Sequence, residues 1–292
     1  MSEKVIKSYK AFDKNMQCRG FKYEVGKEYE MDGEIKCCDR GFHACKSPME
    51  VWDHYDMLSS RFAEVEQSGK IDEEGNSTKV CSSRIKIKAE LKLADIINIG
   101  VEWLKYITSP TKVKETGTLN DNGGDYAKIG SSGYSAQIGS SGDYAQIGSS
   151  GNSAQIGSSG DYAQIGSSGN YAKIGSSGDS AKIGSSGYSA KIGSSGNSAQ
   201  IGSSGDSAKI GSSGNYAKID STGEYSVIMC AGSGSIAKAK LGSWITLAEW
   251  KWSDEKNLNV PICVKTEYVD GNNIKDDTWY QLKNGEFVEV TK

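Results

Sequence analysis

Apolar and polar positions repeat every nine residues between residues 121 and 228. Most units read Ile-Gly-Ser-Ser-Gly, then Asp, Asn or Tyr, then Tyr or Ser, then Ala, and finally Gln or Lys. A fixed period over twelve units is typical of stacked repeat proteins, in which each unit contacts only its neighbours. The recurring isoleucines are Ile129, Ile138, Ile147, Ile156, Ile165, Ile174, Ile183, Ile192, Ile201, Ile210, Ile219 and Ile228.

Each unit divides into a short strand and a turn. The tetrad from Tyr126 to Ile129 is long enough for a strand, and Gly-Ser-Ser-Gly is typical of a turn. Because alternate strand residues share a face, Ala127 and Ile129 are expected to point inward and Tyr126 and Lys128 outward. The glycines at both ends of the turn are expected to supply positive φ angles and close backbone approach.

The repeat excludes an α-helix and disfavours a flexible linker. Its glycines would cost about 2 kcal/mol per unit in a helix interior, and linkers do not place Ile and Ala at a fixed phase. Two units would close an 18-residue coil, which fits the alternation of Tyr and Ser from Tyr126 to Tyr162. A triangular coil of three units stays open. We therefore predict a mainly β fold with a parallel β-solenoid over residues 121–228.

The two flanks read differently from the repeats. Residues 1–115 predict an α+β domain, with a helix that begins at Pro48 after Ser47 as N-cap and ends near Tyr55. Residues 229–292 predict a β cap of irregular rungs, followed by a hairpin whose turn is Asn284-Gly285. The strands expected in the flanks are 5–12, 21–25, 35–38, 61–67, 80–91, 235–239, 243–250, 260–269, 279–282 and 287–290.

Composition narrows the partners. The net charge is −3, from 34 basic and 37 acidic residues, which argues against both a basic nucleic-acid binder and an acidic DNA mimic. A charged start without a following apolar run predicts no signal peptide, and no apolar stretch is long enough to span a membrane. The odd number of cysteines, seven, fits reduced thiols in the cytoplasm.

No metal or cofactor is expected. Cys37, Cys38, His43 and Cys45 lie close together, and Cys18 would join them, but the paired Cys-x₂₋₄-Cys spacing of structural zinc sites is absent. Buried thiols are therefore the favoured interpretation. Calcium is disfavoured because the Asp of each repeat turn stands one place early and alternates with Asn and Tyr.

The repeat surface is a candidate for protein binding. Aromatic residues interleaved with long polar side chains predict a flat ladder, and aromatic rows suit protein interfaces. A solvated face without a specific ligand remains the alternative, and pairing between copies of the chain is left open. The ladder residues are Tyr126, Lys128, Tyr144, Gln146, Tyr162 and Gln164.

A second candidate site lies in the N-terminal flank. The segment Arg-Gly-Phe-His-Ala-Cys (40–45), followed by a helix ending at Tyr55, resembles the strand-then-helix segment of ADP-ribosyltransferases. In this resemblance His43, two residues before Cys45, stands where that family carries a tyrosine. Glu64 or Glu66 would be the late catalytic glutamate. The alternative is a turn that packs His43 against a core.

Two longer segments resemble a group of uncharacterised bacterial and phage proteins with glycine-rich repeats. They are GFHACKSP (41–48) and IKDDTWYQLKNGEFVE (274–289). The resemblance implies an intracellular, prophage-borne protein and brings no catalytic residues. We therefore expect a non-enzymatic interaction or scaffold protein that inhibits a host protein or defence complex. The rival is an enzyme with its site in the N-terminal domain and the solenoid as spacer or oligomerisation stalk.

Overall fold

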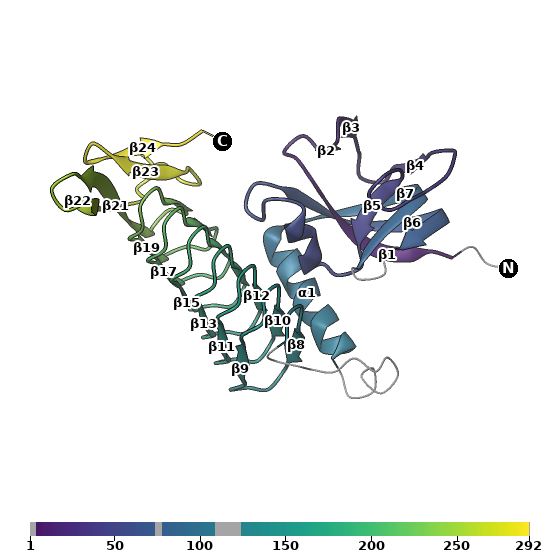
Figure 1. Ribbon diagram of the computed structural model, residues 1–292, viewed down its shortest axis with the longest axis horizontal. Helices are drawn as coiled ribbons and strands as arrows, with labels where there is room; N and C mark the ends of the chain where they lie inside the picture. The colour runs from purple at the N-terminus through teal and green to yellow at the C-terminus, as the bar shows by residue number, and fades with distance from the viewer. Residues whose placement is uncertain (1–3, 74–77, 109–123, 292) are drawn as a thin grey trace. The chain divides into compact units, whose positions relative to one another are not determined.

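The computed structural model describes residues 4–73, 78–108 and 124–291. The chain divides into two compact units, Met1–Trp103 and Leu104–Lys292 (Figure 1). The predicted mainly β fold is confirmed, and the second unit contains the parallel β-solenoid. None of the described helices is long and apolar enough to cross a membrane.

The N-terminal unit is built around an antiparallel sheet with the strand order β4-β7-β5-β1-β6. Because β7 also pairs with β6, the strands β7, β5, β1 and β6 close into a ring. The short strands β2 and β3 form a separate hairpin. The strands are β1 (Ile6–Phe12), β2 (Gln17–Cys18), β3 (Phe21–Lys22), β4 (Glu28–Glu30), β5 (Phe42–Cys45), β6 (Arg61–Glu73) and β7 (Lys79–Leu91).

One face of β1 points into the core of this unit. Ser8, Lys10 and Phe12 share that face, because successive side chains of a strand alternate. Across the β1–β6 ladder, Lys10 lies opposite Ala63 and Ser8 opposite Val65. The apolar core on this side consists of Phe12, Met16, Tyr23, Phe42, Ala44, Ala63, Val65, Ile85 and Ile87.

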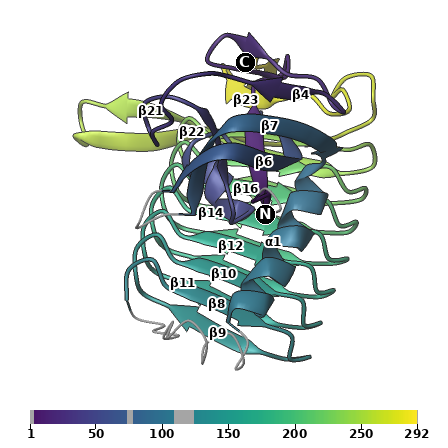
Figure 2. The ribbon, with the colours of Figure 1, turned by 90° about the vertical axis from the view of Figure 1, so that its right-hand side faces the viewer.

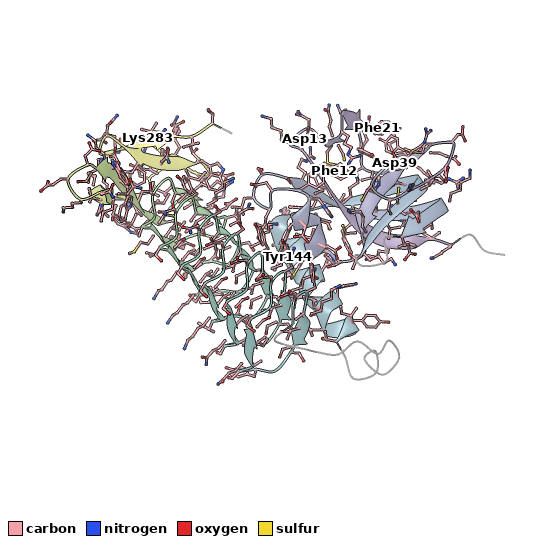
Figure 3. All side chains as sticks on the ribbon, viewed as in Figure 1. Phe12, Asp13, Phe21, Asp39, Tyr144 and Lys283 are labelled. Atoms are coloured by element: carbon pink, nitrogen blue, oxygen red, sulfur yellow. The ribbon has the colours of Figure 1, made fainter. Side chains whose placement is uncertain are left out.

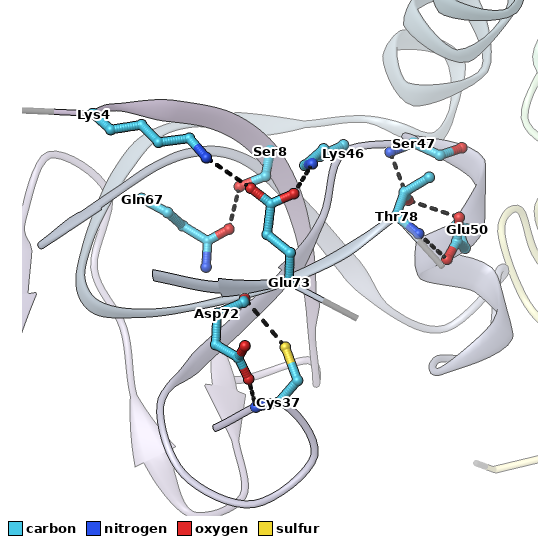
Figure 4. A network of polar contacts seen from close by, with 10 residues as sticks. All are labelled: Lys4, Ser8, Cys37, Lys46, Ser47, Glu50, Gln67, Asp72, Glu73 and Thr78. Carbon is cyan, nitrogen blue, oxygen red and sulfur yellow. Dashed lines mark hydrogen bonds and ion pairs between the residues drawn. The ribbon is translucent and has the colours of Figure 1, made fainter. Parts of the chain in front are cut away.

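The buried amide of Gln67 connects four strands. Its Oε1 accepts a hydrogen bond from Ser8 Oγ of β1 at 2.7 Å (Figure 4). Its Nε2 donates to the carbonyl oxygens of Phe42 on β5, at 2.7 Å, and Val80 on β7, at 3.1 Å. Since unpaired buried polar groups are costly, this glutamine of β6 specifies how the ring closes.

The predicted helix from Pro48 to Tyr55 is wrong in type and in its cap. The segment contains only a 3₁₀ helix, η1 (Met49–Asp53), without a side-chain cap. The Ser47 N–H donates to Thr78 Oγ1 at 3.0 Å, and the Glu50 carboxylate accepts from Thr78 (Figure 4). These longer-range bonds to the start of β7 replace the local capping that the sequence predicts.

Two further elements of this flank differ from the prediction. Residues 35–38 make a turn with an isolated bridge instead of a strand. An unpredicted helix, α1 (Leu93–Ile107), follows β7. Gly100 stands inside it because a Cβ there would lie 2.8 Å from Cγ of Met49. Close packing against Met49 therefore outweighs the low helix propensity of glycine.

The solenoid consists of strands stacked in two parallel sheets (Figure 2). Within the repeats each strand residue pairs with the residue 18 positions further on, as Ile147 does with Ile165 and Ile156 with Ile174. Two repeats per coil are thereby confirmed, and the triangular coil is excluded. Stacking continues beyond residue 228 through two further strands, β20 and β21.

We call the two sheets the β8 sheet and the β9 sheet. The stacked strands of the β8 sheet are β8 (Lys128–Ser131), β10 (Gln146–Ser149), β12 (Gln164–Ser167), β14 (Lys182–Ser185), β16 (Gln200–Ser203), β18 (Lys218–Ser221) and β20 (Ile236–Ala239). Those of the β9 sheet are β9 (Gln137–Ser140), β11 (Gln155–Ser158), β13 (Lys173–Ser176), β15 (Lys191–Ser194), β17 (Lys209–Ser212), β19 (Val227–Cys230) and β21 (Trp244–Ser253).

Each strand begins two residues later than the sequence predicts. The first is Lys128–Ser131 rather than Tyr126–Ile129. Tyr126 has a φ of 59° and belongs to the turn, in the left-handed region that most side chains avoid. The isoleucines and the first serine of each unit share the inner face, and Ile147 and Ser149 are fully buried. The predicted inward alanines are confirmed, although they enter the core from the end of the turn.

In the repeats of the β9 sheet the two glycines have different roles, and neither has a positive φ. At Gly178, the second glycine of its turn, an added Cβ would lie 2.0 Å from the carbonyl oxygen of Gly160 in the preceding coil. At Gly175, the first glycine, it would meet nothing within 4 Å. The second glycine therefore permits the coils to stack, whereas the positive φ angles fall on the Tyr and Ser that follow it by two residues.

Antiparallel strands cover the C-terminal end of both sheets (Figure 1). A long strand, β22, pairs with β21, and the β23–β24 hairpin pairs with β20. The hairpin turn has φ values of 54° at Asn284 and 74° at Gly285, as the predicted two-residue turn requires. The strands are β22 (Leu258–Tyr268), β23 (Tyr280–Lys283) and β24 (Glu286–Glu289).

Lys238 of β20 connects the last coil to this cap. Its Nζ lies 2.8 Å from Asp277 Oδ1 and 3.2 Å from Asp220 Oδ2. Burial by itself lowers the pKa of Lys238, but the two carboxylates outweigh burial, and the pKa is raised. The cap is thus held by a charged contact as well as by backbone pairing.

Candidate functional site

A pocket of about 750 Å³ opens in the N-terminal unit, where β1, β4, β5 and the β2–β3 hairpin meet. Aromatic side chains form much of its wall. Phe21, labelled in Figure 3, packs edge-on against Tyr23 and Tyr29 with ring centroids 4.8 and 5.2 Å apart. The aromatic lining residues are Tyr9, Phe21, Tyr23, Tyr29, Phe42 and Tyr55.

Lys10 supplies a charge among these rings. Its side chain is buried, and Nζ donates to the carbonyl oxygen of His43 at 2.8 Å and to Cys18 Sγ at 3.6 Å. The same atom lies 5.6 and 5.5 Å from the ring centroids of Phe12 and Tyr23. Burial lowers the pKa of Lys10, which the neighbouring thiol only partly offsets. Within the described part of the chain, Lys10 forms no ion pair with a carboxylate.

Cys18 also contacts the hydroxyl of Tyr55, with Sγ 2.7 Å from Oη. Burial and this hydrogen bond raise the pKa of Tyr55, and burial raises that of Tyr23. Both phenols therefore remain protonated near neutral pH. Lys10 Nζ and the Tyr55 hydroxyl both contact Cys18 at one wall of the pocket.

His43 is held as a neutral ring. Its Nε2 accepts a hydrogen bond from the backbone N–H of Cys38 at 3.0 Å. Burial, and then the charge of Lys10, lower the pKa of His43. Cys45 lines the same pocket, but burial raises the pKa of its thiol, which keeps it protonated and unreactive.

The two predicted glutamates lie elsewhere. Glu64 Oε2 pairs with Lys7 Nζ at 2.9 Å, and Glu66 Oε1 pairs with Lys88 Nζ at 3.0 Å, both outside the pocket. The structure therefore brings His43, Cys45 and Tyr55 together without either glutamate. The carboxylates that do line the pocket are those of Glu28 and Glu30, and both pair with Arg84.

Sequence reasoning missed the cations of this pocket, which are Lys10, Arg19 and Lys79. A usable signal was present, since Lys10 interrupts the inward face of a predicted strand, between Ser8 and Phe12. Arg19 carries no such signal, because its position depends on the tight β2–β3 hairpin, where it has a φ of 52°.

The Gly-Phe-His-Ala-Cys segment has a structural explanation. Gly41 has a φ of 135°, and a Cβ there would lie 2.1 Å from Cys81 Sγ. Phe42 and Ala44 then point into the core, while the carbonyl oxygen of His43 binds Lys10. The motif thus positions β5 as one wall of the pocket.

No cluster of three or more metal-ligating side chains occurs among residues 4–73, 78–108 and 124–291. In the solenoid turns, Asp143 Oδ1 accepts the backbone N–H of Asp161 at 2.8 Å, and Asp161 Oδ1 accepts that of Asp179 at 2.7 Å. These Asp side chains bridge successive coils, so each has a structural role that needs no calcium.

The predicted tyrosine ladder is a row of stacked rings at the edge of the β8 sheet. Centroids are 5.0 Å apart between Tyr126 and Tyr144 and 4.9 Å apart between Tyr144 and Tyr162, with interplanar angles of 8° and 5°. Figure 3 labels Tyr144. These rings lie on the turns, whereas Lys128, Gln146 and Gln164 are the first residues of strands. The prediction that the ladder is exposed is wrong for Gln146 and Gln164, which are buried.

The outer face of the β9 sheet, which sequence reasoning did not single out, is a shallow groove of about 770 Å³. Its floor is the row of first glycines, and one wall is a row of exposed long side chains. That wall changes along the stack from glutamine to lysine: Gln137, Gln155, Lys173, Lys191 and Lys209.

The groove ends at an apolar patch on the same sheet. Val227 and Met229 of β19 continue the two rows, and Trp244 of β21 stacks on Val227 in the ladder. The Trp244 ring lies 5.0 Å from that of Tyr268. The patch residues are between 43% and 64% exposed, and they are Val227, Met229, Trp244, Ile262, Val264 and Tyr268.

One family model matches the chain, over residues 6–99, and is described as a domain of unknown function (DUF7666). The match begins in β1 and ends within α1. Every residue that lines the pocket lies inside it. Searches of curated proteins and of solved structures found no match for the chain.

Proposed function

We propose that this protein is a non-enzymatic interaction protein whose solenoid presents a rigid surface to a protein partner. The observation that carries the proposal is the outer face of the β9 sheet, where a lysine row leads into an exposed apolar patch. Contiguous exposed apolar groups mark interaction sites, and Trp, Tyr and Met are favoured in interfaces. The charge of Lys173, Lys191 and Lys209 selects an acidic partner surface.

The resemblance of the two flanking segments to bacterial and phage proteins directs the proposal to a bacterial partner. We propose a host protein or defence complex whose action is blocked when this face covers it. A rigid repeat surface suits this role, since little conformational entropy is lost when a preformed face binds.

A pull-down from bacterial lysate with the full chain and two matched variants tests this. One variant changes Lys173, Lys191 and Lys209 to Glu. The other changes Tyr126, Tyr144 and Tyr162 to Ser, the residue that the repeat itself uses in that column. Loss of the captured protein only in the lysine variant supports the β9 face. Loss only in the tyrosine variant moves the interface to the predicted ladder, and retention by both contradicts an interface at the lysine row or at the tyrosine row.

The enzyme alternative keeps one supporting observation, that His43, Cys45 and Tyr55 line one pocket. An ADP-ribosyltransferase-like activity would then use a glutamate other than Glu64 or Glu66, because both lie outside it. Turnover of nicotinamide dinucleotide by the full chain, abolished in His43→Ala, would support it. Equal turnover in wild type and variant would reject it.

A further inference from the structure

We propose that the pocket of the N-terminal unit binds a small organic anion, with its carboxylate or phosphate on Lys10 and its ring-bearing body against the aromatic wall. The pocket lies within Met1–Trp103, so binding there is independent of the solenoid interface. Binding of such a ligand does not require catalysis.

Lys10 is buried, and none of the described carboxylates pairs with its charge. Burying an ammonium away from water is costly unless a counter-charge or full hydrogen bonding compensates. Nζ has three hydrogens, and the structure gives it two acceptors, the His43 carbonyl oxygen and the weak acceptor Cys18 Sγ. An anion in the pocket would supply the missing acceptor and the missing charge.

Further cations and donors line the pocket around Lys10. Arg19, which is exposed, and Lys79 both add positive charge. Tyr55 presents its hydroxyl next to Cys18. The nearest lining carboxylates, Glu28 and Glu30, are occupied by Arg84 at 3.5 and 2.9 Å. The pocket therefore offers donors and cations to a ligand, and both glutamates of its lining are paired with Arg84.

The wall of the pocket is largely aromatic and partly exposed. Phe21 is 45% exposed although it packs on two buried or half-buried rings, Tyr23 and Tyr29. An exposed aromatic residue at the rim of a pocket is suited to cover a flat ligand. A volume of about 750 Å³ accommodates a molecule of metabolite size. The ligand class is therefore a small molecule that carries both a ring and an anionic group.

The test is a titration of the ¹⁵N-labelled full chain, followed by NMR, with indole-3-acetate, its neutral amide indole-3-acetamide, phenyl phosphate and inorganic phosphate. We expect each ring-bearing anion to bind at least about tenfold tighter than the amide, the effect of one charge-assisted contact. Tighter binding of indole-3-acetate would indicate a carboxylate site, and tighter binding of phenyl phosphate a phosphate site. Inorganic phosphate alone is expected to bind weakly, because it leaves the aromatic wall uncovered.

Two variants on the same strand separate recognition from structure. Lys10→Met keeps the length of the side chain and is expected to remove the preference for anion over amide. Lys7→Met removes an outward lysine that pairs with Glu64 and is expected to keep it. Equal binding of acid and amide to the wild type, or the same preference in Lys10→Met, would overturn the proposal. So would the absence of binding by all four probes.

A second measurement needs no variant. In the wild type, binding of the acid weakens as the pH rises through the pKa of Lys10, whereas binding of the amide does not. The other titratable or charged groups that line the pocket with Lys10 are Tyr9, Cys18, Arg19, Tyr23, Glu28, Tyr29, Glu30, Cys38, His43, Cys45, His54, Tyr55 and Lys79. Because both probes meet the same protein groups at each pH, the difference between them isolates the anion. A difference that stays constant up to pH 10.5 rejects Lys10 as its partner.

Discussion

The N-terminal unit and the solenoid handle polar groups in opposite ways. In the solenoid each role is repeated along a column: one Ile per unit fills the core, one Gly permits stacking, and in most units an Asp or Asn binds the backbone of the next coil. In the N-terminal unit single residues carry single roles, as Gln67 and Lys10 do. A substitution in one repeat leaves the equivalent residues of the other repeats in place. A single buried polar group has no equivalent, and burying it lowers the stability of the fold. We therefore place the candidate ligand site at Lys10 and the candidate partner site on the surface of the solenoid.

The largest expected effect on stability comes from a substitution at the second of the two glycines in a repeat. Gly178→Ala places a Cβ 2.0 Å from the carbonyl oxygen of Gly160, and the coils must separate. We expect a loss of about 3 kcal/mol or more in the free energy of unfolding. Gly175→Ala, three residues earlier, faces open space and should change it by less than about 0.5 kcal/mol. Thermal unfolding followed by circular dichroism measures both, and equal effects would refute the assigned roles.

The second-largest expected effect on stability concerns the buried lysine of the N-terminal unit. Lys10→Met removes a buried charge and should stabilise the ligand-free protein by about 1–2 kcal/mol near neutral pH. The pKa of Lys10 in the folded state lies below the 10.5 of an unfolded lysine. Between these values the unfolded state binds more protons, so wild-type stability rises with pH. The advantage of the variant should therefore shrink toward pH 10.5 in urea unfolding, while a variant that destabilises at every pH would contradict a costly buried ammonium.

A third, smaller effect concerns the strained turns. Ser180 has a φ of 56°, a conformation that costs a non-glycine residue about 1–2 kcal/mol. Ser180→Gly should therefore leave stability unchanged or raise it by up to about 1 kcal/mol. Ser177→Gly, at a negative φ, should lower it by about 0.5–1 kcal/mol. Calorimetric melting of both variants measures these changes in stability. A larger loss of stability for Ser180→Gly than for Ser177→Gly would show that the Ser180 side chain supports the turn.

The sequence predicts the solenoid well because its evidence is periodic. Ile147 and Ile165 lie 18 residues apart, so their pairing follows from the period alone. The period does not show at which residue each strand begins and ends, because Gly148 looks like a turn residue in the sequence but lies inside β10. Propensity also gives no reason to place Tyr144 at a φ of 56°. That conformation follows from the hydrogen bond of its N–H to Asp161 of the next coil, at 2.8 Å.

The pocket could be predicted only in part. His43 and Cys45 share a strand and Tyr55 follows closely, so their proximity is local. Lys10 and Cys18 reach the same place through β1 and the β2–β3 hairpin, which no spacing rule connects to β5. Glu64 and Glu66 are near in sequence, but β6 turns both outward to Lys7 and Lys88. Strand alternation, not sequence distance, decides which side chains meet.

The smallest expected effect concerns the inner serine column of the solenoid. Ser176 is buried, and its Oγ has no hydrogen-bond partner in the part of the chain that the structure describes. Because an unpaired buried hydroxyl is unfavourable, Ser176→Ala should leave the free energy of unfolding unchanged or raise it by up to about 0.5 kcal/mol. The adjacent Ser177→Ala, on the outside, is the matched control and should have no measurable effect. A loss above about 1 kcal/mol at Ser176 alone would mean that the hydroxyl is satisfied, and the column would then share the role that Gln67 has in the N-terminal unit.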